Sequence, residues 1–201
     1  METEDNVFAT IPNLTTAAGG RHARRFVVIG LAVLMMLAAT TYAAAPDDQI
    51  TVREKDGTYE VAATFIVARP TAVVTAVLTD YVRIPHYMPE VRSSQLIERR
   101  DDRAVVEQEA VARFLMFSKR VHLILDVEET PLAIAFRDRC GQSFERYEGM
   151  WLMSENGVGT RITYRLTANP AFDVPSWLLS RLLKRDAAEM IERLRAEIAG
   201  H

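Results

Sequence analysis

Side chains able to do acid–base or metal chemistry are few in this chain. Beyond residue 45 the histidines are His86, His122 and His201, and Cys140 is the single cysteine of the sequence. A metal site needs several such ligands at close spacing, and no His-x-x-His motif, cysteine pair or acidic pair is placed to supply them. No serine lies in a Gly-x-Ser-x-Gly motif. We therefore expect no catalytic residues, no metal and no cofactor.

The two internal histidines and the cysteine have simpler structural explanations. His86 follows Pro85 in a short helical link, where it would cap the helix, face solvent, or contact a ligand's polar group at a cavity entrance. His122 alternates with Val121 and Leu123, which predicts the exposed face of a strand. Cys140 has no partner for an internal disulfide, and we expect it to be buried.

Apolar and aromatic side chains are the better candidates for a functional site. On the strands, Phe136, Tyr147, Trp151 and Tyr164 share the phase of the buried positions. On the last helix, Leu179, Leu183 and Met190 would face them, and Phe114 and Phe117 flank an apolar strand end that would form a mouth. Ordinary core packing explains each residue equally well. As a set they predict a ligand-binding cavity.

The elements that must position these residues follow from the apolar periodicity. Two β-favouring runs flank Asp56-Gly57, which predicts a hairpin over residues 50–68. After Pro70 the sequence predicts a helix over residues 71–79, followed by one further helical turn between Pro85 and Pro89.

Alternation of apolar and polar residues then predicts antiparallel strands between residues 91 and 168. A long helix follows over residues 176–199, with apolar positions spaced by three and four. The result is an α+β domain in which a curved antiparallel sheet wraps around a long C-terminal helix.

The N-terminal part predicts export. Three arginines (Arg21, Arg24 and Arg25) precede the uncharged run 26–39, and small residues follow up to Ala45. This is the pattern of a signal peptide over residues 1–45, and an uncleaved membrane anchor over residues 26–45 is the alternative. Residues 46–201 would then form one ligand-binding domain in the periplasm or cell envelope. A net charge of −3 gives no attraction for nucleic acid.

An apolar cluster precedes the last helix. Phe172, Val174, Trp177 and Leu178 would either anchor the helix by burial, which we favour, or make transient contact with a membrane surface, with basic residues nearby. Nothing in the sequence defines an oligomeric state.

The order of these segments resembles a known family. The residues that carry the resemblance are the segment Leu78–Ser94 with its two prolines, Gly149-Met150-Trp151-Leu152 followed by Gly159–Tyr164, and the closing helix up to Ile198. Together they resemble the START-related (SRPBCC) superfamily with its helix-grip fold, and within it the polyketide cyclase and coenzyme Q-binding branch.

This resemblance implies binding of a hydrophobic small molecule such as a quinone, lipid or polyketide-like compound, with transfer of the bound molecule as an additional role. The alternative that it leaves open is an aromatase/cyclase that uses the same cavity, with Tyr164, His86 or Glu148 in its chemistry.

Overall fold

The structure is a computed structural model that describes residues 48–114 and 117–201 of the chain. The predicted signal peptide or anchor, residues 1–45, lies outside the described residues, as do Leu115 and Met116. Within the described ranges, no helix has both the length and the apolar character needed to cross a membrane.

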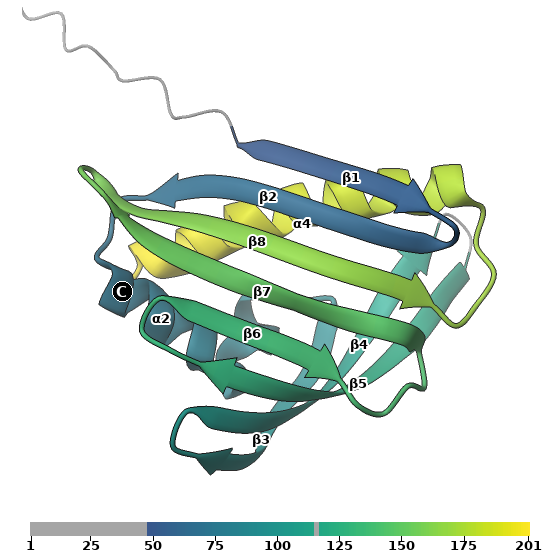
Figure 1. Cartoon of the computed structure of the whole chain (residues 1–201), viewed down its shortest axis with the longest axis horizontal. Helices are drawn as coiled ribbons and strands as arrows, with labels where there is room; N and C mark the ends of the chain where they lie inside the picture. The colour runs from purple at the N-terminus through teal and green to yellow at the C-terminus, as the bar shows by residue number, and fades with distance from the viewer. Residues whose placement is uncertain (1–47, 115–116) are drawn as a thin grey trace, which may run out of the picture. The chain divides into compact units, whose positions relative to one another are not determined.

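The described strands form a single eight-stranded antiparallel sheet (Figure 1). Its spatial order is β1-β2-β8-β7-β6-β5-β4-β3, so the first hairpin lies against the last strand. The strands are β1 (Gln49–Lys55), β2 (Thr58–Val67), β3 (Val91–Arg100), β4 (Arg103–Phe114), β5 (Phe117–Glu129), β6 (Ala133–Asp138), β7 (Phe144–Asn156) and β8 (Gly159–Pro170).

The first hairpin turns at the predicted dipeptide. Asp56 and Gly57 both adopt positive φ angles, 51° and 77°. Two consecutive residues with positive φ are what a two-residue turn needs to match the twist of its strands, and Asp-Gly tolerates this conformation well. The backbone N–H of Gly57 also donates to Glu54 Oε1 at 3.0 Å. The predicted hairpin is confirmed.

Three short helical segments connect β2 to β3: α2 (Thr71–Thr79), η1 (Tyr81–Arg83) and α3 (Ile84–Tyr87). Pro70 directly precedes α2. The first residues of a helix have no intrahelical acceptor for their backbone N–H groups, so a proline, which has no N–H, fits at this position. Helix α2 buries Val74, Val77 and Leu78 against the core. Pro85 and Pro89 limit α3 to a single turn, as the sequence predicted.

The long helix α4 (Ser176–Ala199) begins and ends where the periodicity predicted. Its buried face includes Ile191, Leu194 and Ile198, which are at most 1% exposed. Among the described residues, three ion pairs link α4 to segments earlier in the chain: Arg193 Nη1 lies 2.5 Å from Glu90 Oε2, Arg195 Nη2 lies 2.7 Å from Asp48 Oδ1, and Glu197 Oε1 lies 2.9 Å from Arg83 Nε.

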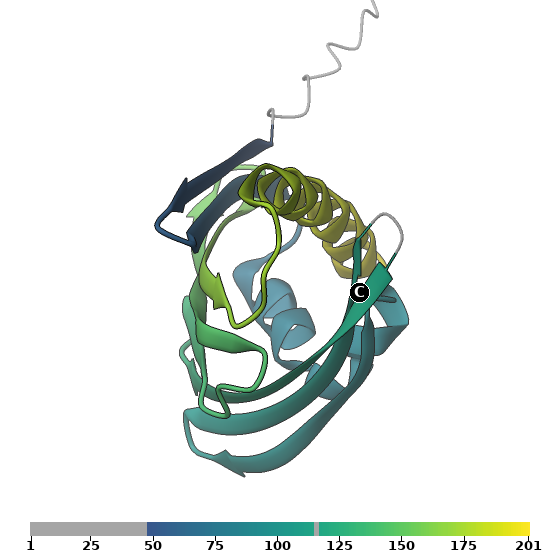
Figure 2. The same ribbon diagram turned by 90° about the vertical axis from the view of Figure 1, so that its right-hand side faces the viewer.

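The sheet curls strongly, and the helices lie on its concave side (Figures 1 and 2). Alternate residues of β2, β5 and β8 are buried on this side, among them Phe65 at 2% and Ile162 at 0% exposure. Helix α4 contacts β1 and β2, and α2 contacts β7, β8 and α4. This arrangement is the predicted α+β helix-grip fold.

Candidate ligand-binding cavity

A cavity of about 350 Å³ lies between the concave side of the sheet and the helical segments. Strands β3 to β8 contribute one wall, the helical segments α2, η1 and α3 form a second, and the middle of α4 forms a third. Most of the surface is apolar, with Leu78, Ile84, Met88, Val91, Leu125, Val127, Ile134, Phe136, Trp151, Met190 and Leu194 among the lining residues. Such a lining binds ligands mainly by removing apolar surface from water.

Aromatic rings form the sheet wall of the cavity. Trp151 of β7 is paired in register with Tyr164 of β8, and their ring centroids are 4.3 Å apart. The rings of Phe136 on β6 and Tyr147 on β7 are 5.9 Å apart. Alternate residues of a strand point to the same side of the sheet, so Tyr147 and Trp151 reach the same cavity.

A glycine makes room for one of these rings. Gly149 lies between Tyr147 and Trp151 on β7 and is paired with Phe136. A Cβ atom at Gly149 would lie 2.6 Å from Phe136 Cζ and 2.4 Å from the backbone oxygen of Arg165. The missing side chain therefore lets the Phe136 ring lie directly over the backbone of the neighbouring strand.

The helical wall contributes two tyrosines that are already hydrogen bonded. Tyr81 donates its hydroxyl proton to Glu129 Oε1 at 2.8 Å, and Arg99 Nη1 lies 2.9 Å from Glu129 Oε2. Tyr87 donates to the backbone oxygen of Val77 at 3.5 Å. Burial raises the pKa of both phenols, so both remain neutral. The first contact holds η1 against β5 of the sheet, and the second holds α3 against α2.

The two tyrosines of the sheet wall differ from Tyr81 and Tyr87 in their hydrogen bonding. Tyr147 and Tyr164 line the cavity, and within the described part of the chain neither hydroxyl has a hydrogen-bond partner. Burial raises the pKa of Tyr147 to about 12, with a further contribution from the charge of Asp138. Burial also raises the pKa of Tyr164 well above its usual value, and Tyr147 adds to this shift. Both are neutral donors at physiological pH.

One side of the cavity carries charge. Glu90, Asp186, Glu189 and Arg193 contribute to the lining. Arg193 is paired with Glu90 and also with Glu189, whose Oε2 lies 3.1 Å from Nη2. Asp186 pairs with Arg185 at 2.9 Å. The one cation of the described lining is therefore already neutralised by carboxylates, which leaves an acidic side.

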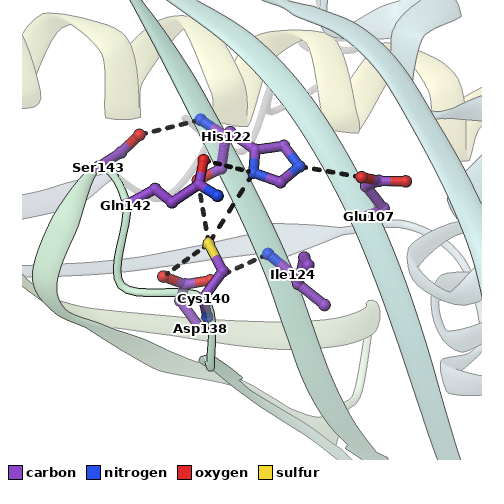
Figure 3. A network of polar contacts seen from close by, with 7 residues as sticks. All are labelled: Glu107, His122, Ile124, Asp138, Cys140, Gln142 and Ser143. Carbon is purple, nitrogen blue, oxygen red and sulfur yellow. Dashed lines mark hydrogen bonds and ion pairs between the residues drawn. The ribbon is translucent and has the colours of Figure 1, made fainter.

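A separate polar network lies on the opposite side of the sheet (Figure 3). His122 Nε2 is 2.9 Å from Glu107 Oε1, and His122 Nδ1 is 3.1 Å from Gln142 Oε1. The sulfur of Cys140 lies 4.0 Å from His122 Nδ1 and 3.6 Å from Asp138 Oδ2. The sequence predicted that Cys140 is buried. The thiol is instead half-buried and has an imidazole beside it.

This network is not arranged as a nucleophilic site. A thiolate at Cys140 would face the carboxylate of Asp138, which is unfavourable. The backbone N–H groups of Cys140 and Gly141 donate to Asp138 at 3.2 and 3.0 Å, so they are not free to stabilise an oxyanion. Among the described residues, no group of three or more His, Cys, Asp or Glu side chains is placed to hold a metal ion.

Most of the predicted ligand-binding residues meet at the cavity. Phe136, Tyr147, Trp151, Tyr164 and Met190 all line it. The side chains of Phe114 and Phe117 lie outside the described part of the structure, so their placement at a mouth stays a prediction.

The two leucines predicted from α4 lie elsewhere. Leu179 is 8% exposed and packs with Tyr59 in a separate small cluster, and Leu183 packs at the edge of both clusters. The reason is their position along the helix axis, since the cavity begins one turn further on, at Asp186. They share a helix face with Met190 but belong to the packing that anchors α4.

Two residues named for an enzyme alternative are also outside the cavity. His86 is exposed on α3 and does not line the cavity. Glu148 lies on the outer side of β7, where it pairs with Arg146 and with Arg137 at 2.9 Å. The hydrogen bond from Arg146 lowers the pKa of Glu148. Of the three named residues, only Tyr164 reaches the cavity.

Sequence reasoning missed the helical and polar lining. Tyr81, Tyr87 and Met88 come from irregular segments, where no periodicity indicates which side chains turn inward. Gln108 was detectable, because it occupies an inward position of β4 between Val106 and Ala110. There its side chain donates to Ser94 Oγ at 3.2 Å.

The apolar cluster before α4 is only partly buried. Phe172, Val174 and Leu178 are half-buried, but Trp177 is 67% exposed, so our preference for burial was wrong for this residue. Trp177 lies in the first turn of α4 and is not among the buried residues of that helix.

A curved sheet that encloses an apolar cavity against one long helix defines the helix-grip class of proteins. Residues 58–199 match the family described as polyketide cyclase/dehydrase and lipid transport, and the chain belongs to this family of the START-related superfamily.

Solved structures share the fold at low sequence identity. A STAR-related lipid transfer protein from Xanthomonas axonopodis is 19% identical, with a TM-score of 0.58 over 76% of this chain and 98% of its own. A START superfamily protein from Mycobacterium smegmatis is 18% identical, with a TM-score of 0.59 over 70% of this chain and 97% of its own. The Zhui aromatase/cyclase from Streptomyces sp. R1128 is 16% identical, with a TM-score of 0.56 over 71% of this chain and 94% of its own. A search of curated proteins gave no match.

Proposed function

We propose that this protein binds a hydrophobic small molecule in its cavity, of the quinone, lipid or polyketide-like kind, and that it transfers the bound molecule. The observation that carries the proposal is the cavity of about 350 Å³ with a largely apolar and aromatic lining. The family description, which includes lipid transport, supports the same conclusion. Burial of apolar ligand surface contributes roughly 25 cal/mol per Å² to the affinity.

Native mass spectrometry and solvent extraction of the purified full chain test this proposal. We expect a co-purified apolar molecule in the wild type, and much less of it in Met190→Trp, where the larger ring fills cavity space. Leu152→Trp is the matched control, because Leu152 lies on the outer side of β7 and is 37% exposed. Equal ligand content in the two variants would contradict binding in this cavity.

A second candidate function is cyclisation of a polyketide-like substrate in the same cavity. It is favoured by the family description, which includes cyclases, and by the free hydroxyls of Tyr147 and Tyr164 in the cavity. Turnover of a poly-β-ketone substrate that is lost in Tyr164→Phe, with folding and binding retained, would support it. Binding without turnover in the wild type would leave the carrier function.

We propose that Trp177 mediates transient contact with a membrane surface. It is exposed at the start of α4, and Arg181 and Lys184 are exposed on the following turns. An exposed indole next to basic side chains suits the interface of an anionic bilayer. We expect Trp177→Ala to reduce co-sedimentation with phosphatidylglycerol vesicles, whereas Val158→Ala, at an equally exposed position, should not.

We further propose that the domain acts outside the cytoplasm. The support is the sequence of residues 21–45, with arginines before an apolar run and small residues after it. Fusing residues 1–45 to an alkaline phosphatase without its own signal provides the test, since that enzyme is active only after export. An inactive fusion that accumulates in the cytoplasm would contradict this proposal.

A further inference from the structure

A second hollow, of about 610 Å³, opens on the outer side of the sheet. Side chains of β3, β4, β5 and the loop before β7 line it, among them Arg92, Glu109, Arg120, His122 and Gln142. Gln108 lines the ligand-binding cavity, and successive residues of a strand point to opposite sides, so Glu109 faces outward. The outer hollow shares no lining residue with the cavity and is a separate candidate site.

Two arginines of the outer hollow have no carboxylate partner. Arg92 and Arg120 are exposed, and within the described part of the chain neither makes an ion pair or a hydrogen bond. The arginines at the other end of β3 and β4 differ, since Arg99, Arg100 and Arg103 each pair with a glutamate. An unpaired guanidinium group keeps all its N–H donors for a bound anion.

His122 adds a third cation to the outer hollow (Figure 3). Its Nε2 lies 2.9 Å from Glu107 Oε1 and its Nδ1 lies 3.1 Å from Gln142 Oε1, so both ring nitrogens face oxygen acceptors. Only a protonated imidazole donates from both nitrogens, and the hydrogen bond to Glu107 raises the pKa of His122. Because Gln142 accepts through its oxygen, its amide N–H groups are left as donors for a ligand.

The nearby carboxylates do not cancel this charge. Glu107 is paired with His122, and Glu109 is the one carboxylate among the described lining residues of the outer hollow. Arg113, which is also exposed, follows two residues after Val111 on the same side of β4 and adds a further cation. A chain with a net charge of −3 therefore carries a locally positive surface at the outer hollow.

We propose that the outer hollow binds a phosphate group, which Arg92 and Arg120 hold from two strands and to which Gln142 donates as a neutral partner. A phosphate presents several acceptor oxygens around one centre, so it accepts from side chains of different strands at once. A free phosphate compound and the head group of an anionic phospholipid share this chemistry. The inference does not depend on the proposed binding of an apolar molecule in the cavity.

Phosphorus NMR of inorganic phosphate, titrated with the full chain at constant ionic strength, tests this inference. We expect saturable binding in the wild type. Arg92→Gln and Arg120→Gln should each weaken it about ten-fold, the value of one charge-assisted hydrogen bond. Arg161→Gln is the matched control, because it removes the same charge from another exposed arginine, on the outer side of β8. No saturable binding, or equal losses in all three variants, would overturn the proposal.

Glu109→Gln provides an independent test that does not rely on a loss of binding. It removes a negative charge from the lining of the outer hollow, so phosphate binding should become about three-fold tighter. An affinity that stays the same or falls would contradict an anion at this position.

Vesicles distinguish the two sources of the phosphate group. Co-sedimentation with phosphatidylglycerol vesicles is measured for the wild type, for the double variant Arg92→Gln/Arg120→Gln and for Arg161→Gln. A loss in the double variant alone identifies a lipid head group. Unchanged co-sedimentation, together with weaker binding of inorganic phosphate, identifies a free phosphate compound. If neither measurement distinguishes the double variant from Arg161→Gln, the outer hollow is not a phosphate site.

Discussion

Replacing Gly149 by alanine tests the packing between β7 and its neighbours. The added Cβ would lie 2.4 Å from the backbone oxygen of Arg165 on β8, about 1 Å closer than an ordinary contact. It would also lie 2.6 Å from Phe136 Cζ. The ring can turn away, but the oxygen belongs to a strand that is hydrogen bonded to β7. Strand separation is therefore required, and overpacking of this kind destabilises a protein by about 1–3 kcal/mol.

Urea denaturation followed by circular dichroism measures this effect. We expect Gly149→Ala to lower the free energy of unfolding by about 2 kcal/mol, which corresponds to a fall in Tm of roughly 4–8 °C for a domain of this size. We also expect weaker binding of an apolar probe, because Phe136 lines the cavity and its displacement changes the shape of the cavity wall.

Gly157→Ala is the matched control for this substitution. Gly157 lies in the β7–β8 turn, and a Cβ atom added there would have no heavy atom within 4 Å. Its replacement should therefore change stability by no more than about 0.5 kcal/mol. If Gly149→Ala and Gly157→Ala were equally stable, the close approach of Phe136 and Arg165 to Gly149 would not be a feature of the folded protein.

Three further predictions concern the core, the helical wall and the outer network. Ile191→Ala should lower the free energy of unfolding by about 3 kcal/mol in urea denaturation, because Ile191 is 0% exposed and the deletion leaves a void. Tyr81→Phe should lower it by about 1 kcal/mol, since Glu129 loses a hydrogen bond but keeps Arg99; a change below measurement error would contradict the role given to this bond. The hydrogen bond to Glu107 raises the pKa of His122 above its unfolded value. The stabilisation is therefore complete below the unfolded pKa and is lost as pH rises through the folded pKa, so the stability difference between wild type and His122→Gln should shrink over that range. A difference that is independent of pH would refute the charged His122–Glu107 pair.

The fold was largely predictable because its signals are local. Asp56-Gly57 specifies its turn through backbone conformation, and the bounds of α4 follow from Pro175, Gly200 and the spacing between them. Strand phase correctly predicted the inward side of Phe136, Tyr147, Trp151 and Tyr164, because a strand with one buried side alternates strictly.

The site was less predictable because it depends on distances between elements. Helical periodicity identified the face that Leu179 shares with Met190, but it carries no information on where along α4 the cavity begins. The proximity of Cys140 to His122 depends on how the turn after β6 lies against β5, which neither local sequence reveals. Tyr81 and Tyr87 come from segments too short to show a period.

The position of β2 in the sheet has a consequence for how the chain folds. Strand β2 pairs on one side with β1 and on the other with β8, so Thr64 lies opposite Thr163, almost one hundred residues later in the chain. Closing so long a loop is entropically unfavourable and slow. Strand β2 therefore keeps one edge unpaired until β8 has been synthesised, and we expect the seam between β2 and β8 to form last. A nascent chain that stops before residue 159 would leave this edge open to other strands.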